Sequence, residues 1–305
     1  MKIMRWLLVM GVVGVFALGW LCARFFTKSG DTQFSPARER MVVKSSSAHW
    51  QLRSRHLPFG VPVLVDDRYS SLPNSAVPGV SVLVREGFVI GHFDRGKIPL
   101  WMSMRWTKED LLLSLEAKER RRQFHADDEL PKGARGAADY GNSELDRGHL
   151  ARNKDNTAWG EDNARMGDLM SNVVPQPVNL NRGPWLELEK VVSSAPEKRV
   201  ALSDTFWVVA GSIFDNGTVR ETIGNGTAVP DAFFKIVTWM DRNGKLQAMA
   251  FIFPKDVTNR NPTAYLSSID EIESRTGIDF FSALEPEVEK KVEAFVAKRI
   301  WETSQ

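Results

Sequence analysis

The 44 residues from Asp146 to Glu189 gather an unusual set of polar side chains in one short part of the chain. The stretch opens with Asp146-Arg147-Gly148-His149 and passes through Ser171–Gln176, an apolar segment that is typical of a strand end. Asn181 is a favoured N-cap residue, and Pro184 fits only the first turn of a helix. The stretch therefore predicts a strand followed by a helix that begins at Asn181 and ends at about Val192.

The polar side chains of this stretch have the chemistry needed to hydrolyse a phosphodiester with one hard metal ion. Histidine has a reference pKa of about 6.5, so His149 can take a proton from water near neutral pH. Arg147 presents a fork of donors that suits a phosphate oxygen. Asn181 offers a neutral oxygen ligand to Mg²⁺, and Glu189, two helical turns further on, can hold the waters of that ion.

Each of these residues, taken alone, also has a simple structural interpretation. His149 follows a glycine and could be a loop or core histidine, Asn181 could only cap its helix, and Arg147 could be a surface ion-pair partner. Trp185 is typical of core packing whatever the function. Only the combination and its order favour a catalytic site.

The joint pattern resembles the DNA/RNA non-specific endonucleases of the ββα-metal (His-Me finger) type, the Serratia nuclease and endonuclease G group. The resemblance covers about residues 78–284. Its motifs are Asp146–His149, Ser171–Asn172 with Pro175–Gln176, Leu180–Asn181 with Trp185 and Leu188–Glu189, Val229–Lys235, Ala250–Pro254, Asp270–Glu273 and Thr276–Phe281.

The resemblance implies an α+β fold with a central, mostly antiparallel sheet flanked by helices. It implies His149 as the general base on a strand of the ββα unit, Asn181 as the direct metal ligand, and Glu189 as a ligand through water. Arg147 and Asn172 would support the phosphate and the site. The implied reaction cuts DNA and RNA to 5′-phosphate ends with Mg²⁺, for which Mn²⁺ is a possible substitute.

Two further positions bear on this resemblance. The segment Arg122-Gln123-Phe124 resembles the part of the family that carries another phosphate-binding arginine, which assigns that role to Arg122. Some members have an arginine one helical turn after the equivalent of Glu189, where it helps the leaving group. This chain has Ser193 there, so either another cation substitutes or turnover is slower.

Composition limits the classes of protein and of site that this chain can form. The 305 residues are 43% hydrophobic and 26% charged, which is ordinary for a folded protein. The formal charge of +2 is uneven, because four basic residues and no acids lie in residues 1–30, which leaves residues 31–305 at −2. Phosphate affinity must therefore come from local clusters such as Lys118–Arg122. Cys22 is the only cysteine, which excludes intrachain disulfides and a four-ligand Cys/His zinc site.

Residues 1–28 are expected to be a signal peptide or a signal anchor. The apolar run Trp6–Ala23 approaches the roughly 20 residues that span a bilayer, and it lacks a clear small-residue cleavage site, which favours an anchor. Residues 29–77 are rich in Ser, Pro and charge and predict a tether and irregular lead-in. Residues 78–305 form the expected nuclease domain, exported and either membrane-anchored outside the cytoplasm or released as a secreted or periplasmic protein.

Apolar runs predict the strands of the sheet. They cover Val80–Val84, Phe88–Phe93, Pro99–Trp106, Phe206–Gly211, Phe233–Met240 and Leu246–Phe253. Helices are expected over Ser267–Thr276 and Glu285–Trp301, and Lys108–Arg121 has helix-forming composition. Asn216-Gly217 and Asn225-Gly226 predict tight turns.

Two other functions remain open from the sequence. One is a membrane-tethered nucleic-acid receptor that has kept the fold and lost turnover. The other is a metal phosphodiesterase for a different ester, such as a lipid headgroup. The expected partners are DNA and RNA substrates, with the membrane or export machinery at the N-terminal segment, and a homodimer is left open.

Overall fold

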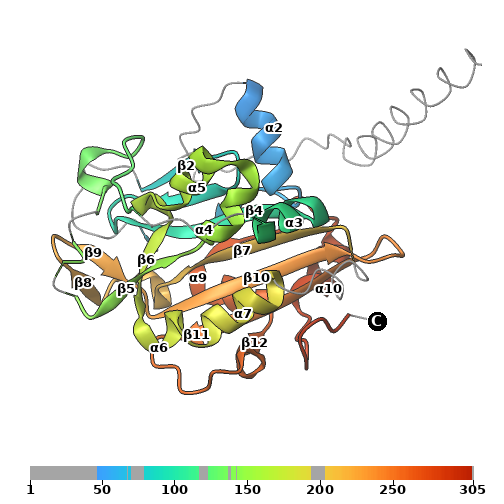
Figure 1. The fold of residues 1–305 in the computed structure, drawn as a ribbon. Coiled ribbons are helices and arrows are strands. Elements are labelled where there is room, and N and C mark those ends of the chain that lie inside the picture. Colours follow the sequence, from blue (N-terminus) through green and yellow to red (C-terminus); the bar gives the residue numbers. More distant parts are fainter. Residues whose placement is uncertain are drawn as a thin grey trace, which may run out of the picture. The chain divides into compact units, whose positions relative to one another are not determined.

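Seven strands form one sheet in the computed structural model of the chain (Figure 1). The structure describes residues 47–66, 68–69, 79–116, 123–136, 139–141, 143–193 and 203–303. The strands are β2 (Val80–Val84), β3 (Val89–Phe93), β4 (Ile98–Thr107), β7 (Thr205–Ile213), β10 (Ala232–Met240), β11 (Leu246–Pro254) and β12 (Leu266–Ser267). Their order is β12-β11-β10-β7-β4-β3-β2, and each neighbouring pair is antiparallel. The expected antiparallel sheet is confirmed, and within it β2–β3 and β10–β11 form hairpins.

The centre of the sheet is buried on both faces. Every residue of β10 except Met240 is buried, and β10 pairs with β7 on one side and β11 on the other. Continuous apolar runs of this kind are typical of strands covered on both sides. Lys235 is the charged exception, in the middle of β10.

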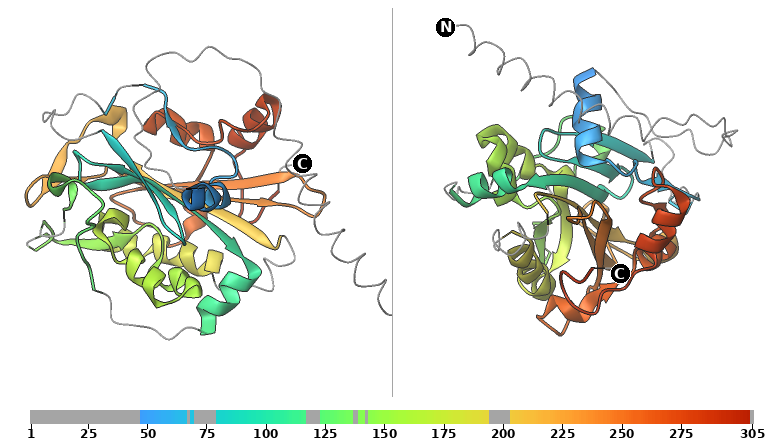
Figure 2. Two further views of the ribbon diagram at one scale, coloured as in Figure 1. Left: turned by 90° about the horizontal axis from the view of Figure 1, so that it is seen from above. Right: turned by 90° about the vertical axis from the view of Figure 1, so that its right-hand side faces the viewer.

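Helices cover both faces of the sheet (Figure 2). The helices are α2 (Ser47–His56), α3 (Lys108–Glu116), α4 (Asn153–Asn156), α5 (Glu161–Gly167), α6 (Val178–Asn181), α7 (Pro184–Ser193), α9 (Ile269–Thr276) and α10 (Pro286–Glu293). Short 3₁₀ turns cover Lys132–Ala134, Thr157–Trp159, Met170–Asn172, Asp215–Gly217 and Pro262–Tyr265. Helices α9 and α10 lie on one side of the sheet, and α4 to α7 lie on the other.

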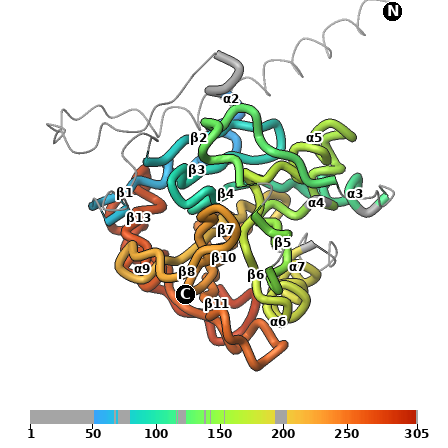
Figure 3. Tube along the Cα trace, turned by 90° about the vertical axis from the view of Figure 1, so that its left-hand side faces the viewer, coloured from blue at the N-terminus to red at the C-terminus, as the bar shows by residue number. Residues whose placement is uncertain are grey.

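Three two-stranded ribbons complete the fold. They are β5 (Leu145–His149) with β6 (Val173–Pro177), β8 (Glu221–Ile223) with β9 (Thr227–Val229), and β1 (Val63–Leu64) with β13 (Ile278–Asp279). The β5–β6 ribbon continues directly into α6 and α7, and these elements lie together beside the large sheet (Figure 3). The ribbon and its helices are the expected ββα unit, with His149 at the end of its first strand.

The predicted helix start at Asn181 is wrong. Asn181 is the last residue of α6, and α7 begins at Pro184. The break occurs because Pro184 has no backbone N–H with which to continue the ladder from α6. The backbone of Gly183 also lies so close to the Asn179 carbonyl that a Cβ atom would meet it at 2.0 Å. Asn181 therefore precedes α7 and does not cap it.

The predicted terminal helix is too long. Helix α10 ends at Glu293, and Val288 and Val296, expected on its buried face, are exposed. Beyond it, Trp301 packs edge-on against Phe206 and Trp239, with ring centroids 5.7 and 5.5 Å away. Packing against the core overrides the helical spacing of this segment.

Residues 47–64, which composition predicts to be irregular, contain α2 and β1. The end of α2 is held by the core, because Trp207 donates a hydrogen bond from its indole to the Arg55 carbonyl at 3.1 Å. The apolar run Trp6–Ala23 and the basic cluster Lys118–Arg122 lie outside the described residues. Within the described ranges, no helix combines the length and the apolar character needed to cross a bilayer.

Candidate active site

The side chain of Gln176 lies directly over Gly148 in the β5–β6 ribbon. A Cβ atom on Gly148 would lie 2.1 Å from the side-chain oxygen of Gln176, so a larger residue there would displace the Gln176 side chain. The register pairs Arg147 with Pro175 and His149 with Val173. Because side chains alternate along a strand, Arg147 and His149 point to the same face of the ribbon.

His149 is oriented by a carboxylate and a ring. Its Nε2 atom lies 3.3 Å from Oδ1 of Asp168, a fully buried residue. Its imidazole stacks on Phe124, with ring centroids 5.2 Å apart. Among the described residues, Nδ1 of His149 makes no hydrogen bond. The ring is fixed through one nitrogen, and the other is left for water.

Asn172 fixes the segments that follow His149 and precede Asp168. Its amide nitrogen donates to the carbonyls of Ala151 and Gly167 at 2.8 and 2.9 Å, and its oxygen accepts from the Ala151 N–H at 2.8 Å. Ala151 follows His149 by two residues, and Gly167 precedes Asp168. Both amide hydrogens of the Asn172 side chain bind backbone carbonyls, as expected of a residue that supports the site.

Arg147 lies between two aromatic rings. Its guanidinium carbon is 5.4 Å from the centroid of Phe124 and 5.2 Å from that of Tyr140. Its Nε atom is buried without a hydrogen-bond partner, and within the described part of the chain no carboxylate pairs with it. A guanidinium that is positioned by rings and not neutralised by an acid can bind an anion.

The carboxamide of Asn181 is oriented by the first residue of the opening motif. Its Nδ2 atom donates to Oδ2 of Asp146 at 2.9 Å. Arg182 binds the same carboxylate at 2.7 and 2.9 Å. Burial alone would raise the pKa of Asp146, but the hydrogen bonds from Arg182 and Asn181 lower it, so the acceptor is charged. The amide nitrogen is thus occupied, and the oxygen of Asn181 is the atom left for a ligand.

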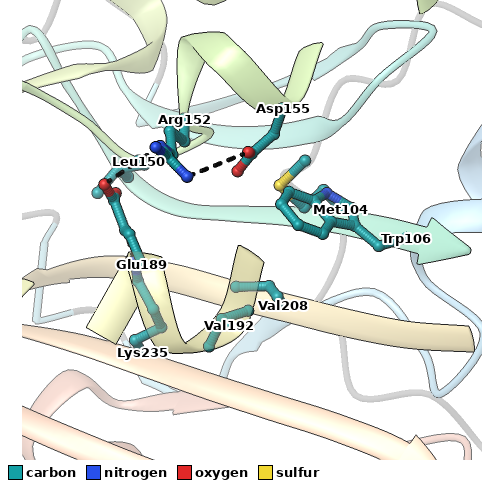
Figure 4. Close-up of a pocket in the computed structure, with 9 residues that line it drawn as sticks. All are labelled: Met104, Trp106, Leu150, Arg152, Asp155, Glu189, Val192, Val208 and Lys235. Carbon is teal, nitrogen blue, oxygen red and sulfur yellow. Dashed lines mark ion pairs between the residues drawn. The ribbon is translucent and has the colours of Figure 1, made fainter. Parts of the chain in front are cut away.

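Glu189 points into a small pocket between α7, the loop after β5, and the sheet (Figure 4). Its two oxygens lie 3.8 Å from Nε of Arg152 and 3.6 Å from Nζ of Lys235. Both distances exceed the roughly 2.7–3.2 Å of a hydrogen bond, so the carboxylate keeps acceptor capacity. The pocket is lined by Met104, Trp106, Leu150, Arg152, Asp155, Glu189, Val192, Val208 and Lys235.

Lys235 is a buried cation within this pocket. Burial lowers its pKa, and the charges of Glu189 and Asp155 oppose that change. Its Nζ atom also lies 3.9 Å from the ring centroid of Trp185. Arg152 in turn lies 3.6 Å from Asp155. Two cations and two carboxylates balance each other, and this network fixes Glu189.

The donor set fits a hard divalent ion. Asn181 presents a neutral oxygen and Glu189 a carboxylate, the ligand types that Mg²⁺ accepts directly or through water. The amide of Gln176 is buried, and neither of its polar atoms has a partner among the described residues. Buried amides of this kind are normally satisfied by water or an ion. The ribbon therefore has polar capacity that the protein itself does not use.

The sequence missed several residues of this site. Asp168 and Phe124 position His149, Arg152 and Lys235 hold Glu189, and Asp146 orients Asn181. Phe124, Asp146 and Lys235 lay within quoted motifs without a role assigned to them, and no local pattern indicated Asp168 or Arg152. Arg122 lies outside the described residues, so its predicted role stays a prediction, and Ser193 is the last residue of α7.

Comparison with known proteins identifies the family. Residues 71–287 match the family model described as DNA/RNA non-specific endonuclease, which covers more than half of the chain. The chain belongs to the DNA/RNA non-specific endonuclease family. It is therefore a phosphodiester-hydrolysing enzyme of a metal-dependent nuclease family.

Relatives in the DNA/RNA non-specific endonuclease family align with this chain over most of their length. The chain is 28% identical to a nuclease of Nostoc sp. over 247 residues, which cover 77% of this chain and 86% of the relative. It is 29% identical to human mitochondrial endonuclease G over 222 residues, 68% and 72% of the two chains. It is 24% identical to the Serratia marcescens nuclease over 242 residues, 75% and 85% of the two chains.

A solved structure shares the fold. The structure of the EndoG/EndoGI complex superposes with a TM-score of 0.62 at 21% identity, covering 80% of this chain and 95% of the matched chain. The expected ββα-metal nuclease fold is thus confirmed.

Proposed function

We propose that this enzyme cuts DNA and RNA internally to 5′-phosphate ends, with His149 as general base and Mg²⁺ at Asn181. The observation that carries the proposal is the contact between Nε2 of His149 and the buried Asp168 carboxylate at 3.3 Å. It leaves Nδ1 as the atom that removes a proton from the attacking water. Asp168 then stabilises the imidazolium that forms, as a carboxylate beside a catalytic histidine does in other hydrolases.

Arg147 is proposed to bind a non-bridging oxygen of the scissile phosphate. It shares a face of β5 with His149, and both pack against Phe124. Its lack of an acidic partner among the described residues supports this role. Because such contacts go to phosphate and not to base edges, base selectivity should be weak.

Asn181 is proposed as the direct ligand of Mg²⁺, with Glu189 holding its waters. Asp146 accepts a hydrogen bond from the amide nitrogen, which leaves the carboxamide oxygen for the ion, and Arg152 and Lys235 hold Glu189 in place. When bound, a hard divalent ion supplies charge stabilisation to the phosphate and the departing oxygen. Mn²⁺ has similar ligand preferences and is proposed as a substitute.

Two cations are proposed to assist at the edges of this site. Arg122 would bind a second phosphate oxygen; the residue after it, Gln123, donates its N–H to Asp168 at 3.1 Å. Arg152 lies against Glu189, one of the residues that would surround the leaving group. We propose that Arg152 substitutes for the arginine that some members carry at the position of Ser193.

The nuclease domain is proposed to work outside the cytoplasm, either tethered by residues 1–28 or released from them. A homodimer is the proposed alternative to a monomer. The mature N-terminus decides between the first two states: an intact Met1 means an anchored enzyme, and a start near residues 24–31 means a released one. Recovery of the active protein in the cytoplasm would contradict export. Light scattering of the purified protein gives the oligomeric state.

The deciding experiment compares the full-length protein with its His149→Ala variant on plasmid DNA and on RNA, with Mg²⁺ and with EDTA. We expect wild-type cleavage of both polymers to fragments with 5′-phosphates, and a loss of at least about 100-fold in the variant. Equal rates in the two proteins would overturn the assignment of His149. Binding without cleavage would favour the receptor, and a preference for small diesters would favour the other phosphodiesterase.

A further inference from the structure

Three carboxylates meet between α9 and α10, on the side of the sheet away from the ββα unit (Figure 2). Oxygens of Asp270, Glu273 and Glu293 lie within 4.8 Å of one another. Helix α9 packs onto the core through Ile269 and Ile272, so Asp270 and Glu273 are on a helix that is fixed in place. Asp270 is exposed, Glu273 is half-buried and Glu293 is buried, so the cluster extends from solvent into the protein.

Glu293 is the member that requires a partner. Glu293 is only 7% exposed, and its Oε1 atom is buried without a hydrogen-bond partner. Glu273 differs, because its Oε1 accepts the Phe280 N–H at 2.9 Å. In the part of the chain that the structure describes, none of the three carboxylates forms an ion pair. A buried, unpartnered carboxylate oxygen that lies near two other carboxylates can be satisfied by a bound cation.

The electrostatics of the cluster agree with this need. Burial raises the pKa of Glu293 to about 8, and repulsion from Glu273 and Glu289 adds to the increase. Burial raises the pKa of Glu273 to about 7, with further repulsion from Asp279 and Asp270. Without a counter-ion the charged forms of these side chains are therefore unfavourable. A bound cation would offset both the burial of the carboxylates and their mutual repulsion.

We propose that Asp270, Glu273 and Glu293 bind a calcium ion that holds α9 against α10. The three oxygens lie within 4.8 Å of one another, so one cation can contact all of them. Ca²⁺ accepts carboxylates in flexible, irregular geometry, whereas Mg²⁺ demands a near-ideal octahedron, and three carboxylates from two helices suit the former. Asp270 opens the site to solvent, so water can complete the six to eight ligands that Ca²⁺ takes. The site is independent of the catalytic residues.

The first test counts bound Ca²⁺ by isothermal titration calorimetry on the full-length chain. All proteins carry Asn181→Ala, which removes the proposed catalytic ligand. The cluster variant is Glu273→Gln with Glu293→Gln, and the matched control is Glu287→Gln, an exposed acid of α10 outside the cluster. We expect one Ca²⁺ in the parent and the control and none in the cluster variant. Equal stoichiometry in the control and the cluster variant would overturn the site.

The second test uses thermal unfolding and an exposed ligand, so that it does not depend on substitutions in the core. At an ion concentration about 100 times the dissociation constant, Ca²⁺ should raise the melting temperature of the parent by roughly 5 °C. Asp270→Asn should lower the Ca²⁺ affinity by about 10-fold without unfolding the chain, and Mg²⁺ should give a smaller rise than Ca²⁺. An unchanged affinity in Asp270→Asn, or equal rises with both ions, contradicts a calcium site. The outcome is separate from nuclease activity, because no residue of the cluster belongs to the catalytic site.

Discussion

Asp146 and Asn181, 35 positions apart in the sequence, are joined by a hydrogen bond of 2.9 Å from the amide nitrogen to the carboxylate. The bond connects the first residue of the conspicuous polar stretch, on β5, with the last residue of α6. It fixes which atom of the carboxamide is free. The orientation of the proposed metal ligand therefore depends on a residue that binds no metal.

Replacing Asp146 by Ala should weaken metal binding. Without its acceptor the Asn181 carboxamide can rotate, so the half-saturating Mg²⁺ concentration should rise about 10- to 100-fold. Arg182→Ala is the matched control, because it removes the exposed partner of Asp146 and keeps the bond to Asn181. Cleavage rates over a series of Mg²⁺ concentrations give the comparison. An equal Mg²⁺ requirement in the two variants would contradict the role of Asp146.

Replacing Asp168 by Asn should lower kcat with little change in KM. The neutral amide can no longer stabilise a protonated His149, so we expect a loss of about 100-fold in kcat. Steady-state kinetics on a defined oligonucleotide separate the two parameters, and a melting curve checks folding. A rise in KM with kcat unchanged would show that Asp168 acts on substrate binding and not on the base.

Lys235→Met should destabilise the fold. It removes one of the two cations that face Glu189 in the pocket and leaves only Arg152, and breaking such a buried pair costs about 3 kcal/mol. Urea unfolding at neutral pH measures the loss. Adding Glu189→Gln to the same protein should recover part of it, because the uncompensated charge is then removed. A double variant as unstable as Lys235→Met would show that packing on Trp185, and not the charge pair, is the cause.

Acid should destabilise the protein in part through His56. Burial lowers the pKa of His56 to about 4; its Nε2 contacts the Glu86 carbonyl and its Nδ1 accepts the Arg105 N–H. The unfolded chain protonates His56 near pH 6.5, and the folded chain does so only near pH 4. Stability is therefore complete above about pH 6.5 and declines as the pH falls towards 4, by up to about 3 kcal/mol.

Chemical unfolding at a series of pH values tests the His56 contribution against a His56→Gln variant. The variant should be less stable at pH 7.5 and should lose less further stability between pH 7 and pH 4.5. Parallel pH curves for the two proteins would assign the acid sensitivity to carboxylates elsewhere.

The sequence predicted the strands of the sheet and the residues of the proposed chemistry, because both leave local signals. Apolar runs such as Phe233–Met240 indicate a buried strand wherever they occur, and the order of His149, Asn181 and Glu189 is specific. Asp168 left no signal, since its contact with His149 depends on how the loop between β5 and β6 folds back onto β5. Arg152 was missed for the same reason.

The errors at helix ends have tertiary or steric causes. Asn181 and Pro184 are individually suited to one helix start, yet Asn181 ends the short helix Val178–Asn181 and Pro184 begins a second helix. The apolar spacing of residues 285–301 is helical, but contacts of Trp301 with the core end the helix at Glu293. Neither outcome can be inferred from periodicity alone.

The proposed base, its orienting carboxylate, the metal amide and the second acid all belong to one uninterrupted piece of 44 residues, and the large sheet adds Lys235 from β10. Most of the proposed reaction chemistry is therefore contiguous in the sequence, and Phe124 and Lys235 are contacts that it takes from elsewhere. Differences in the choice of polymer must then arise from surfaces encoded elsewhere, so chains that share this piece can diverge widely in what they degrade.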